Sequence, residues 1–261
     1  MRSKKKNKQI YFLCAIPRSG NTLFTSVMNQ NPDLVVTPNS ITLAIMRDLH
    51  LLKRRDTFQN FPDERSLNNV MDEVYNLYYK HWNYKVIIDR GPVCTPFNLN
   101  VMKKHFKTPI LCVVLVRDIL DVLASYIKWF ENEPTSFFNQ YKTLDEKLNI
   151  IMDDNGAVAK GLMSIQYLLD HPKTAVFIKY DDLVVNPEKE LRKVYKFLNL
   201  PYYPHKFTDL NQVVVNGRSY NDEFVGKNMH TIRTEKIMKV ENEYKKLIPE
   251  RFVKAYGHIQ F

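Results

Sequence analysis

A short run near the N-terminus has the composition of a site that binds a phosphate or sulfate group. The run reads Ile-Pro-Arg-Ser-Gly-Asn-Thr-Leu and covers residues 16–23. Its glycine permits a tight turn and a close approach of the backbone to a ligand. Arg18 supplies a fixed positive charge, and hydrogen-bonding side chains follow at Ser19, Asn21 and Thr22. Because the first N–H groups of a helix are unpaired, a helix beginning here would complete an anion site.

A second group of polar residues follows another apolar run. Arg117 comes directly after residues 110–116, and Ser125 lies eight residues later, about two helical turns along. The two side chains can converge on one anion near the C-terminal edge of a sheet, where open α/β folds bind ligands. A local ion pair of Arg117 with Asp118 is the alternative interpretation. Two anion-suited elements, each at the end of an apolar strand, favour a binding site.

The elements that must position these residues alternate between strands and helices. Strands are predicted at 10–16, 34–36, 84–88, 110–116 and 175–179. Helices are predicted at 21–30, 41–52, 67–82, 97–106, 119–130, 144–169 (interrupted near Gly156), 187–198 and 235–247, with a long loop over 211–233. This alternation predicts an α/β fold, a three-layer sandwich whose central parallel sheet is flanked by helices. We expect a basic flexible N-terminus over 1–9 and one domain over 10–261.

Composition and charge limit the class of protein. The chain of 261 residues is 44% hydrophobic, and none of its apolar runs approaches the roughly 20 residues of a membrane helix. The first apolar run ends in the anion loop and not at a small-residue cleavage site, so we expect no signal peptide and a cytoplasmic protein. A net charge of +10 favours anionic partners without specifying which.

The cysteine pattern does not indicate a disulfide framework or a metal site. There are three of them, an odd number, and none forms a Cys-x-x-Cys pair. We therefore expect small buried side chains in a reducing compartment. The chain shows no clustered ligand set, so no metal is expected.

The ordered set of motifs resembles that of sulfotransferases that use 3′-phosphoadenosine 5′-phosphosulfate (PAPS). Residues 16–23 look like the family's 5′-phosphosulfate loop, and residues 116–126 look like its 3′-phosphate element. Residues 179–201, which include Tyr-Asp-Asp-Leu, Asn-Pro and Phe-Leu-Asn-Leu-Pro, are similar to the segment that follows the family's next strand. The resemblance implies a P-loop-like sulfotransferase fold and a reaction that leaves adenosine 3′,5′-bisphosphate (PAP).

The resemblance also implies roles for individual residues. The 5′-phosphosulfate would be held by Arg18, Ser19, Gly20, Asn21, Thr22 and Leu23. The 3′-phosphate would be held by Arg117 and Ser125, with Tyr180 near the nucleotide. A basic loop over 226–233 is similar to the family's late loop over the donor, and its candidates are Lys227 and Arg233.

The catalytic base is the point at which the sequence departs from the family pattern. Sulfotransferases generally place a His or Glu after the first helix or after the next core strand, but residues 37–40 read Thr-Pro-Asn-Ser. The second region offers Asp89 as the base, with Arg90 as a charge-stabilising partner. His50 is the alternative base. Arg18 would stabilise the leaving group.

Two other functions compete with sulfuryl transfer to a hydroxyl or amine. A P-loop kinase using ATP would have a similar architecture, but the loop lacks the Gly-x-x-x-x-Gly-Lys-Ser/Thr pattern. A non-catalytic basic module for nucleotides or nucleic acid has only the net charge, the lysines within 4–8 and some aromatic residues in its favour. Under the preferred hypothesis the acceptor is open among carbohydrates, small molecules, lipids and tyrosine. The sequence does not indicate an oligomeric state.

Overall fold

A five-stranded parallel sheet forms the centre of the computed structural model, which describes residues 8–133, 135–224, 226–238 and 243–261. The strand order is β2-β3-β1-β4-β5, and every neighbouring pair is parallel. The strands are β1 (Gln9–Ala15), β2 (Leu34–Val36), β3 (Val86–Arg90), β4 (Cys112–Val116) and β5 (Ala175–Lys179). The predicted parallel sheet is therefore confirmed.

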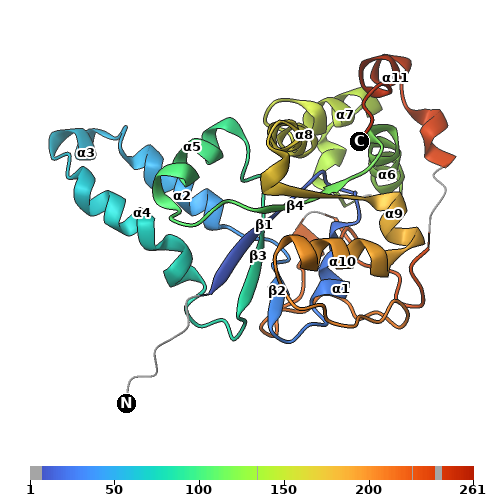
Figure 1. The fold of residues 1–261 in the computed structure, drawn as a ribbon. Helices are drawn as coiled ribbons and strands as arrows, with labels where there is room; N and C mark the ends of the chain where they lie inside the picture. The colour runs from blue at the N-terminus through green and yellow to red at the C-terminus, as the bar shows by residue number, and fades with distance from the viewer. Residues whose placement is uncertain (1–7, 134, 225, 239–242) are drawn as a thin grey trace.

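Helices cover both faces of the sheet, because the strands are apolar on both sides. In β1, Phe12 and Cys14 face one core and Leu13 faces the other. The first core is covered by α2 (Thr42–Leu52), α4 (Glu64–Tyr78), α5 (Pro96–His105), α6 (Ile119–Asn132), α7 (Leu144–Met152), α8 (Ala157–Leu169) and α11 (Glu250–Tyr256). The second is covered by α1 (Asn21–Met28), α9 (Tyr180–Val185) and α10 (Pro187–Phe197). The result is the expected three-layer sandwich (Figure 1).

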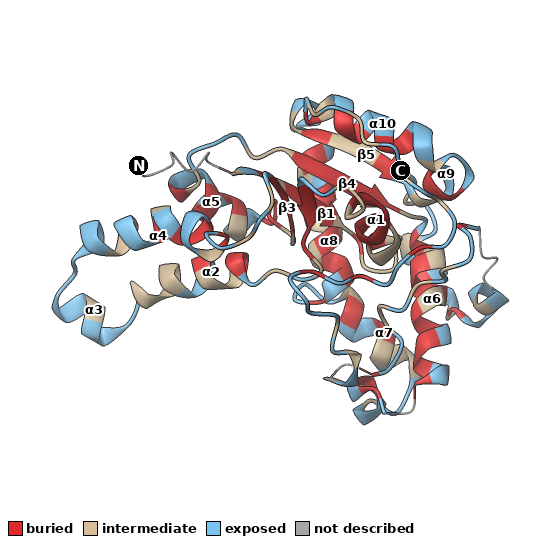
Figure 2. Ribbon diagram, turned by 90° about the horizontal axis from the view of Figure 1, so that it is seen from below, coloured by how far each residue is buried: buried red, intermediate tan, exposed pale blue. Residues whose placement is uncertain are grey.

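An arm of helices extends from one edge of this body. It consists of α2, the short α3 (Asp56–Asn60) and α4, and it projects away from the sheet in both ribbon views (Figures 1 and 2). The buried residues concentrate in the strands and on the helix faces toward them, whereas much of the arm is exposed or only half-buried (Figure 2). Short 3-10 helices are found at η1 (Phe137–Gln140), η2 (Pro172–Thr174), η3 (Asp222–Phe224) and η4 (Glu243–Leu247).

Of two helices predicted in the second half of the chain, one is confirmed and the other is wrong in part. The helix predicted over 144–169 is interrupted at Gly156, as expected, between α7 and α8. The helix predicted over 235–247 is wrong in its first part. Residues 234–237 exchange backbone hydrogen bonds with 207–210 instead of forming a helix, and Ile237 is buried in the core. Residues 239–242 lie outside the described part, and 243–247 form the 3-10 helix η4.

The three cysteines are free and buried, as expected, but they also gather at one place under the sheet. The Cys112 sulfur lies 3.9 Å from that of Cys14 and 3.8 Å from that of Cys94. These distances are ordinary contacts between sulfur atoms. Within the described ranges, no helix is long and apolar enough to cross a membrane. Most of the basic N-terminus, residues 1–7, lies outside those ranges, and its flexibility and the single-domain boundary stay predictions.

Candidate active site

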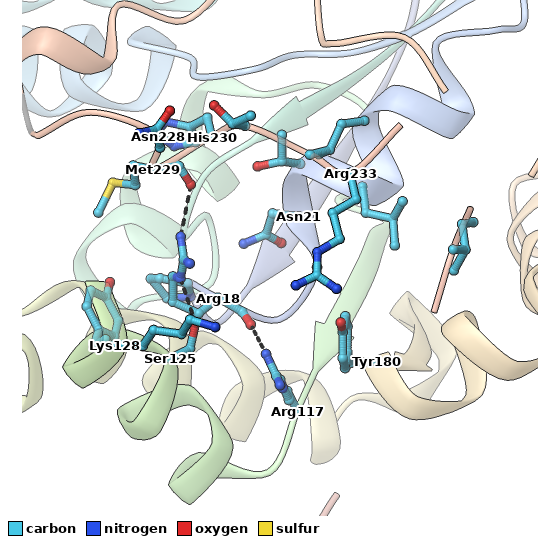
Figure 3. Close-up of a pocket in the computed structure, with 18 of the residues that line it drawn as sticks. Arg18, Asn21, Arg117, Ser125, Lys128, Tyr180, Asn228, Met229, His230 and Arg233 are labelled. Carbon is cyan, nitrogen blue, oxygen red and sulfur yellow. Dashed lines mark hydrogen bonds between the residues drawn. The ribbon is translucent and has the colours of Figure 1, made fainter. Parts of the chain in front are cut away.

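A cavity of about 650 Å³ lies at the C-terminal ends of the central strands. Its walls come from the loop after β1, the ends of β3 and β4, helix α6, the first residue of α9 and the segments 228–233 and 236–238. The labelled side chains in Figure 3 converge on it from these separate elements. This is the edge at which open parallel sheets bind ligands.

The loop after β1 leads directly into α1 with its helix N-terminus uncovered. Gly20 is the N-cap residue and has no side chain with which to cap the helix, and among the described residues no side chain accepts a hydrogen bond from its first turn. Gly20 has a φ of 87°, and a Cβ atom there would lie 2.8 Å from the Tyr180 ring. Glycine is thus required twice, by the left-handed backbone and by the ring packed against it. The uncovered N–H groups and the helix dipole favour an anion at this point.

The polar side chains of this loop differ in their orientation. Ser19 is fully buried and donates to the backbone oxygens of Ile16 and Leu115, so it stabilises the loop without lining the cavity. Asn21 lines the cavity, but its Nδ2 donates to Ile16 O over 3.1 Å. Thr22 and Leu23 also line the cavity. The backbone of this loop therefore offers more free donors than its side chains do.

Arg18 connects the loop with two other elements. Its backbone has a φ of 65°, its Nε donates to Ser125 Oγ over 3.0 Å, and its Nη1 donates to the backbone oxygen of Met229 over 2.9 Å. Figure 3 shows the guanidinium between α6 and the C-terminal segment. Burial lowers the pKa of Arg18, but a guanidinium remains charged at neutral pH. One fixed charge is thus held at the centre of the cavity.

Arg117 and Tyr180 form the opposite wall. The Arg117 Nη1 atom donates to Arg18 O over 3.0 Å, and its guanidinium lies 4.3 Å from the centre of the Tyr180 ring. The Nε atom of Arg117 is buried and has no partner in the described structure. An unpaired buried donor on a charged group is costly without a ligand. The structure therefore brings Arg117, Ser125 and Tyr180 together with the loop, in the arrangement that the sequence predicts.

The C-terminal segment closes over the cavity through contacts with α6. Gly226 packs so tightly against Trp129 and Ser136 that a Cβ atom would lie 2.9 Å from the Trp129 ring. Asn228 Nδ2 donates to Glu133 Oε1 over 3.1 Å. Of the two basic residues predicted in this segment, Arg233 lines the cavity and Lys227 does not. Lys227 is exposed and contributes only its carbonyl, which accepts from Trp129 Nε1.

The three candidates for acceptor chemistry lie in different places. Asp89 lies within β3, is 1% exposed and does not line the cavity. Its carboxylate accepts hydrogen bonds from the hydroxyls of Thr37, Thr42 and Tyr79, and burial raises its pKa. The Asp89 side chain therefore connects the sheet with the base of the helical arm.

Arg90 does line the cavity, where its Nη1 donates to Pro38 O over 2.7 Å and to Tyr220 Oη over 2.9 Å. His50 lies in α2 against the edge of Phe97, outside the cavity. Of Asp89, Arg90 and His50, only Arg90 is brought together with the anion-binding loop. Their catalytic roles stay predictions.

The sequence interpretation did not single out His230, Asp222, Tyr220 and Lys128. His230 and Lys128 line the cavity, and the His230 ring is hydrogen-bonded to Asp222 and stacked on Tyr220. A histidine eight residues after an aspartate in an irregular segment has no periodic signal. Two hints were available: a long loop in a compact fold is usually functional, and the loop over 226–233, which contains His230, resembles the family's late loop over the donor.

Comparison with solved structures finds proteins of similar fold. The chain is similar in fold to a sulfotransferase domain from the curacin biosynthetic pathway (17% identity, 98% of this chain and 93% of that chain, TM-score 0.53). It is also similar to one from the olefin synthase of Synechococcus PCC 7002 (14% identity, 100% and 98%, TM-score 0.54). A sulfotransferase from Alicyclobacillus acidocaldarius is a third such structure (12% identity, 95% and 92%, TM-score 0.51). No curated protein sequence matches significantly.

At these low identities the structural likenesses establish the fold alone, and the sequence itself establishes the family. The sulfotransferase family model matches residues 11–204, which contain the loop after β1 together with Arg117, Ser125 and Tyr180. The match covers most of the chain and ends before the segment that closes the cavity. The chain belongs to the sulfotransferase family.

Proposed function

We propose that the protein transfers a sulfuryl group from PAPS to a hydroxyl or amine acceptor. The observation that carries this proposal is the convergence of two separate anion-binding groups on one cavity. The uncovered N-terminus of α1 and the Arg18 guanidinium form one group, and Arg117 with its unpaired Nε forms the other. A nucleotide with anionic groups at both its 5′ and 3′ positions has the chemistry that matches them.

The residues divide into a 5′ group and a 3′ group. The 5′-phosphosulfate would be held by the backbone N–H groups of residues 20–23 and by Arg18. The 3′-phosphate would be held by Arg117 and Ser125, whose hydroxyl is 3.0 Å from Arg18 Nε. Tyr180 offers a ring face beside Arg117 for the nucleotide. Arg233 lines the same cavity and adds a positive charge there.

The protein would accelerate transfer by position and charge. PAPS supplies the activated sulfuryl group when it is bound. Arg18 and the α1 N-terminus would stabilise the negative charge that develops on the leaving phosphate, because fixed dipoles and charges in a cavity need not reorganise. The part of the cavity that Arg90 lines would receive the acceptor. No metal is required in this scheme, and a cytoplasmic location stays a prediction.

Thermal denaturation with different ligands tests the donor. Saturating PAP without metal should stabilise the protein by about 2.7 kcal/mol at a hundredfold excess over its dissociation constant. ATP with magnesium should stabilise it less. Stabilisation by ATP with magnesium alone would refute the proposal in favour of a kinase.

A transfer screen with labelled sulfate from PAPS tests the reaction and identifies the acceptor. The acceptors should include sugars, lipids, small metabolites and tyrosine peptides. Transfer by the wild type and its loss in Arg18→Ala is the expected result. Equal transfer by both proteins would contradict the role of the loop.

A further inference from the structure

A histidine and an aspartate form a hydrogen-bonded pair at the wall of the cavity. His230 Nδ1 lies 2.6 Å from Asp222 Oδ1, and the backbone N–H of His230 donates to Asp222 Oδ2 over 2.8 Å. Both carboxylate oxygens of Asp222 are thus used to hold one residue. The side chains are 14% and 17% exposed, respectively. Such a doubly anchored, largely buried pair has a fixed orientation.

The Asp222 contact determines which nitrogen of His230 can accept a proton. A carboxylate accepts hydrogen bonds, so the neutral ring carries its hydrogen on Nδ1. The lone pair is then on Nε2, and no bond from Nε2 to another described residue is present. His230 lines the same cavity as Arg18 and Arg90. A buried aspartate that orients a histidine for proton transfer is a recurrent arrangement in catalysis.

Tyr220 connects this pair with the end of β3. The rings of His230 and Tyr220 are stacked, with centroids 3.9 Å apart and planes 2° from parallel. Tyr220 Oη donates to Pro38 O over 3.0 Å and accepts from Arg90 Nη1 over 2.9 Å. The imidazole is therefore positioned by Asp222 and Tyr220, and Tyr220 is in turn held by Pro38 and Arg90.

The charges around His230 favour the neutral imidazole. Burial lowers its pKa, Asp222 acts in the opposite direction, and the guanidinium groups of Arg90 and Arg18 lower it further. The net effect is a pKa below the ordinary value of 6.5. An uncharged ring at neutral pH is the form that can take a proton.

We propose that His230, oriented by Asp222, is the general base that deprotonates the sulfate acceptor. The inference rests on the proposed function. The acceptor oxygen, or nitrogen, forms a bond to the donor's sulfur while its proton passes to His230 Nε2. The sulfur–oxygen bond to the 5′-phosphate breaks, and its electron pair leaves with PAP. The imidazolium then releases the proton to solvent.

This assignment resolves the choice of base in favour of a residue at the cavity. Asp89 is used by three hydroxyl donors and lies away from the cavity, and His50 packs in the helical arm. Asp222 acts through His230 and is therefore a positioning residue. Arg90, which contacts Tyr220, would stabilise charge on the acceptor side.

Steady-state kinetics of His230→Gln provide the first test. Loss of a general base should lower kcat about 10²- to 10⁴-fold. The dissociation constant for PAP, measured by calorimetry, should change less than about twofold, and the thermal midpoint should show that the variant is folded. His258→Gln is the matched control, because His258 is exposed and does not line the cavity. If the wild type is active and His230→Gln keeps its kcat, the role of His230 as the base is refuted, while the proposed sulfuryl transfer is not.

The pH dependence of kcat/KM distinguishes a base from a structural histidine. Protonation inactivates a base, so the wild-type rate should fall as pH drops through the His230 pKa, below 6.5. This acid limb should be absent in His230→Gln. In Asp222→Asn it should move to lower pH, because the pKa-raising carboxylate is removed. An acid limb unchanged in both variants would contradict the proposal.

Nuclear magnetic resonance of the imidazole nitrogens gives a readout without turnover. In the wild type without ligand, we expect the Nδ1–H tautomer for His230 and a pKa below 6.5. An Nε2–H tautomer would refute the base assignment while leaving the donor site intact. A wild type that binds no PAP and transfers no sulfate would refute the proposed function, and this inference with it.

Discussion

Replacement of Arg117 by lysine tests the 3′ side of the cavity, because lysine keeps the charge and loses the guanidinium geometry. In the structure the Arg117 Nη1 atom donates to Arg18 O over 3.0 Å, the guanidinium carbon lies 4.3 Å from the centre of the Tyr180 ring, and Nε has no partner among the described residues. One guanidinium can therefore support the loop and bind an anion at the same time. A lysine ammonium is a point charge and cannot span both partners.

The expected cost follows from the bonds lost. Hydrogen bonds to charged groups contribute about 1.5–3 kcal/mol each. Losing one of them should weaken PAP binding about 10- to 150-fold, since about 1.4 kcal/mol corresponds to a factor of ten. Folding should change little, because Arg117 is only half-buried and the substitution keeps the net charge.

Calorimetric titration of PAP into wild type and Arg117→Lys measures this difference. Arg218→Lys is the matched control, because Arg218 is exposed and lies away from the cavity. A thermal scan of each protein without ligand separates binding from stability. Equal affinity in Arg117→Lys and wild type would refute the assignment of Arg117 to the 3′-phosphate.

Three further substitutions have expected outcomes. Gly20→Ala should lower the free energy of unfolding by about 1–3 kcal/mol in urea titrations, because it forces alanine into a left-handed backbone against Tyr180. Ser125→Ala should weaken PAP binding by less than Arg117→Lys in the same calorimetry, since it removes a neutral hydroxyl near a charge. Asp89→Asn should slow transfer less than tenfold, whereas the loss of a general base would slow it about 10²-fold or more. Burial raises the Asp89 pKa, so its stabilising contribution is present at acid pH and is lost as pH rises from 3.8 through the folded pKa. In Asp89→Asn this decrease of the free energy of unfolding with rising pH should be absent, which unfolding curves measured at a series of pH values would show.

The convergence of the loop at 16–23 with Arg117 could be predicted because its signals are local in the sequence. The loop at 16–23 follows a continuous apolar strand, and Arg117 follows another. Parallel strands end at the same edge of the sheet, so two local patterns were enough to bring Arg18 and Arg117 together. The structure has their atoms in direct contact.

The side of the cavity to which we assign the acceptor depends on contacts that no local pattern contains. Asp89 and Arg90 are neighbours in β3, and side chains on a strand alternate between its faces. Asp89 therefore points into the helices of the arm while Arg90 reaches the cavity. His230 reaches the same cavity because its segment is held by Asp222, by Trp129 of α6 and by Glu133 directly after α6. The pairing of 234–237 with 207–210 likewise overrode a helical pattern.

Binding of PAP in the absence of metal is the measurement that tests the central claim most directly. Isothermal titration of wild type and Arg18→Ala with PAP, repeated with ATP and magnesium, compares the relevant ligands on the intact chain. We expect saturable one-site binding of PAP by the wild type, strong weakening in Arg18→Ala and no requirement for magnesium. Absence of PAP binding by a folded wild type, or binding that Arg18→Ala leaves unchanged, would contradict the assignment of this cavity to the sulfuryl donor.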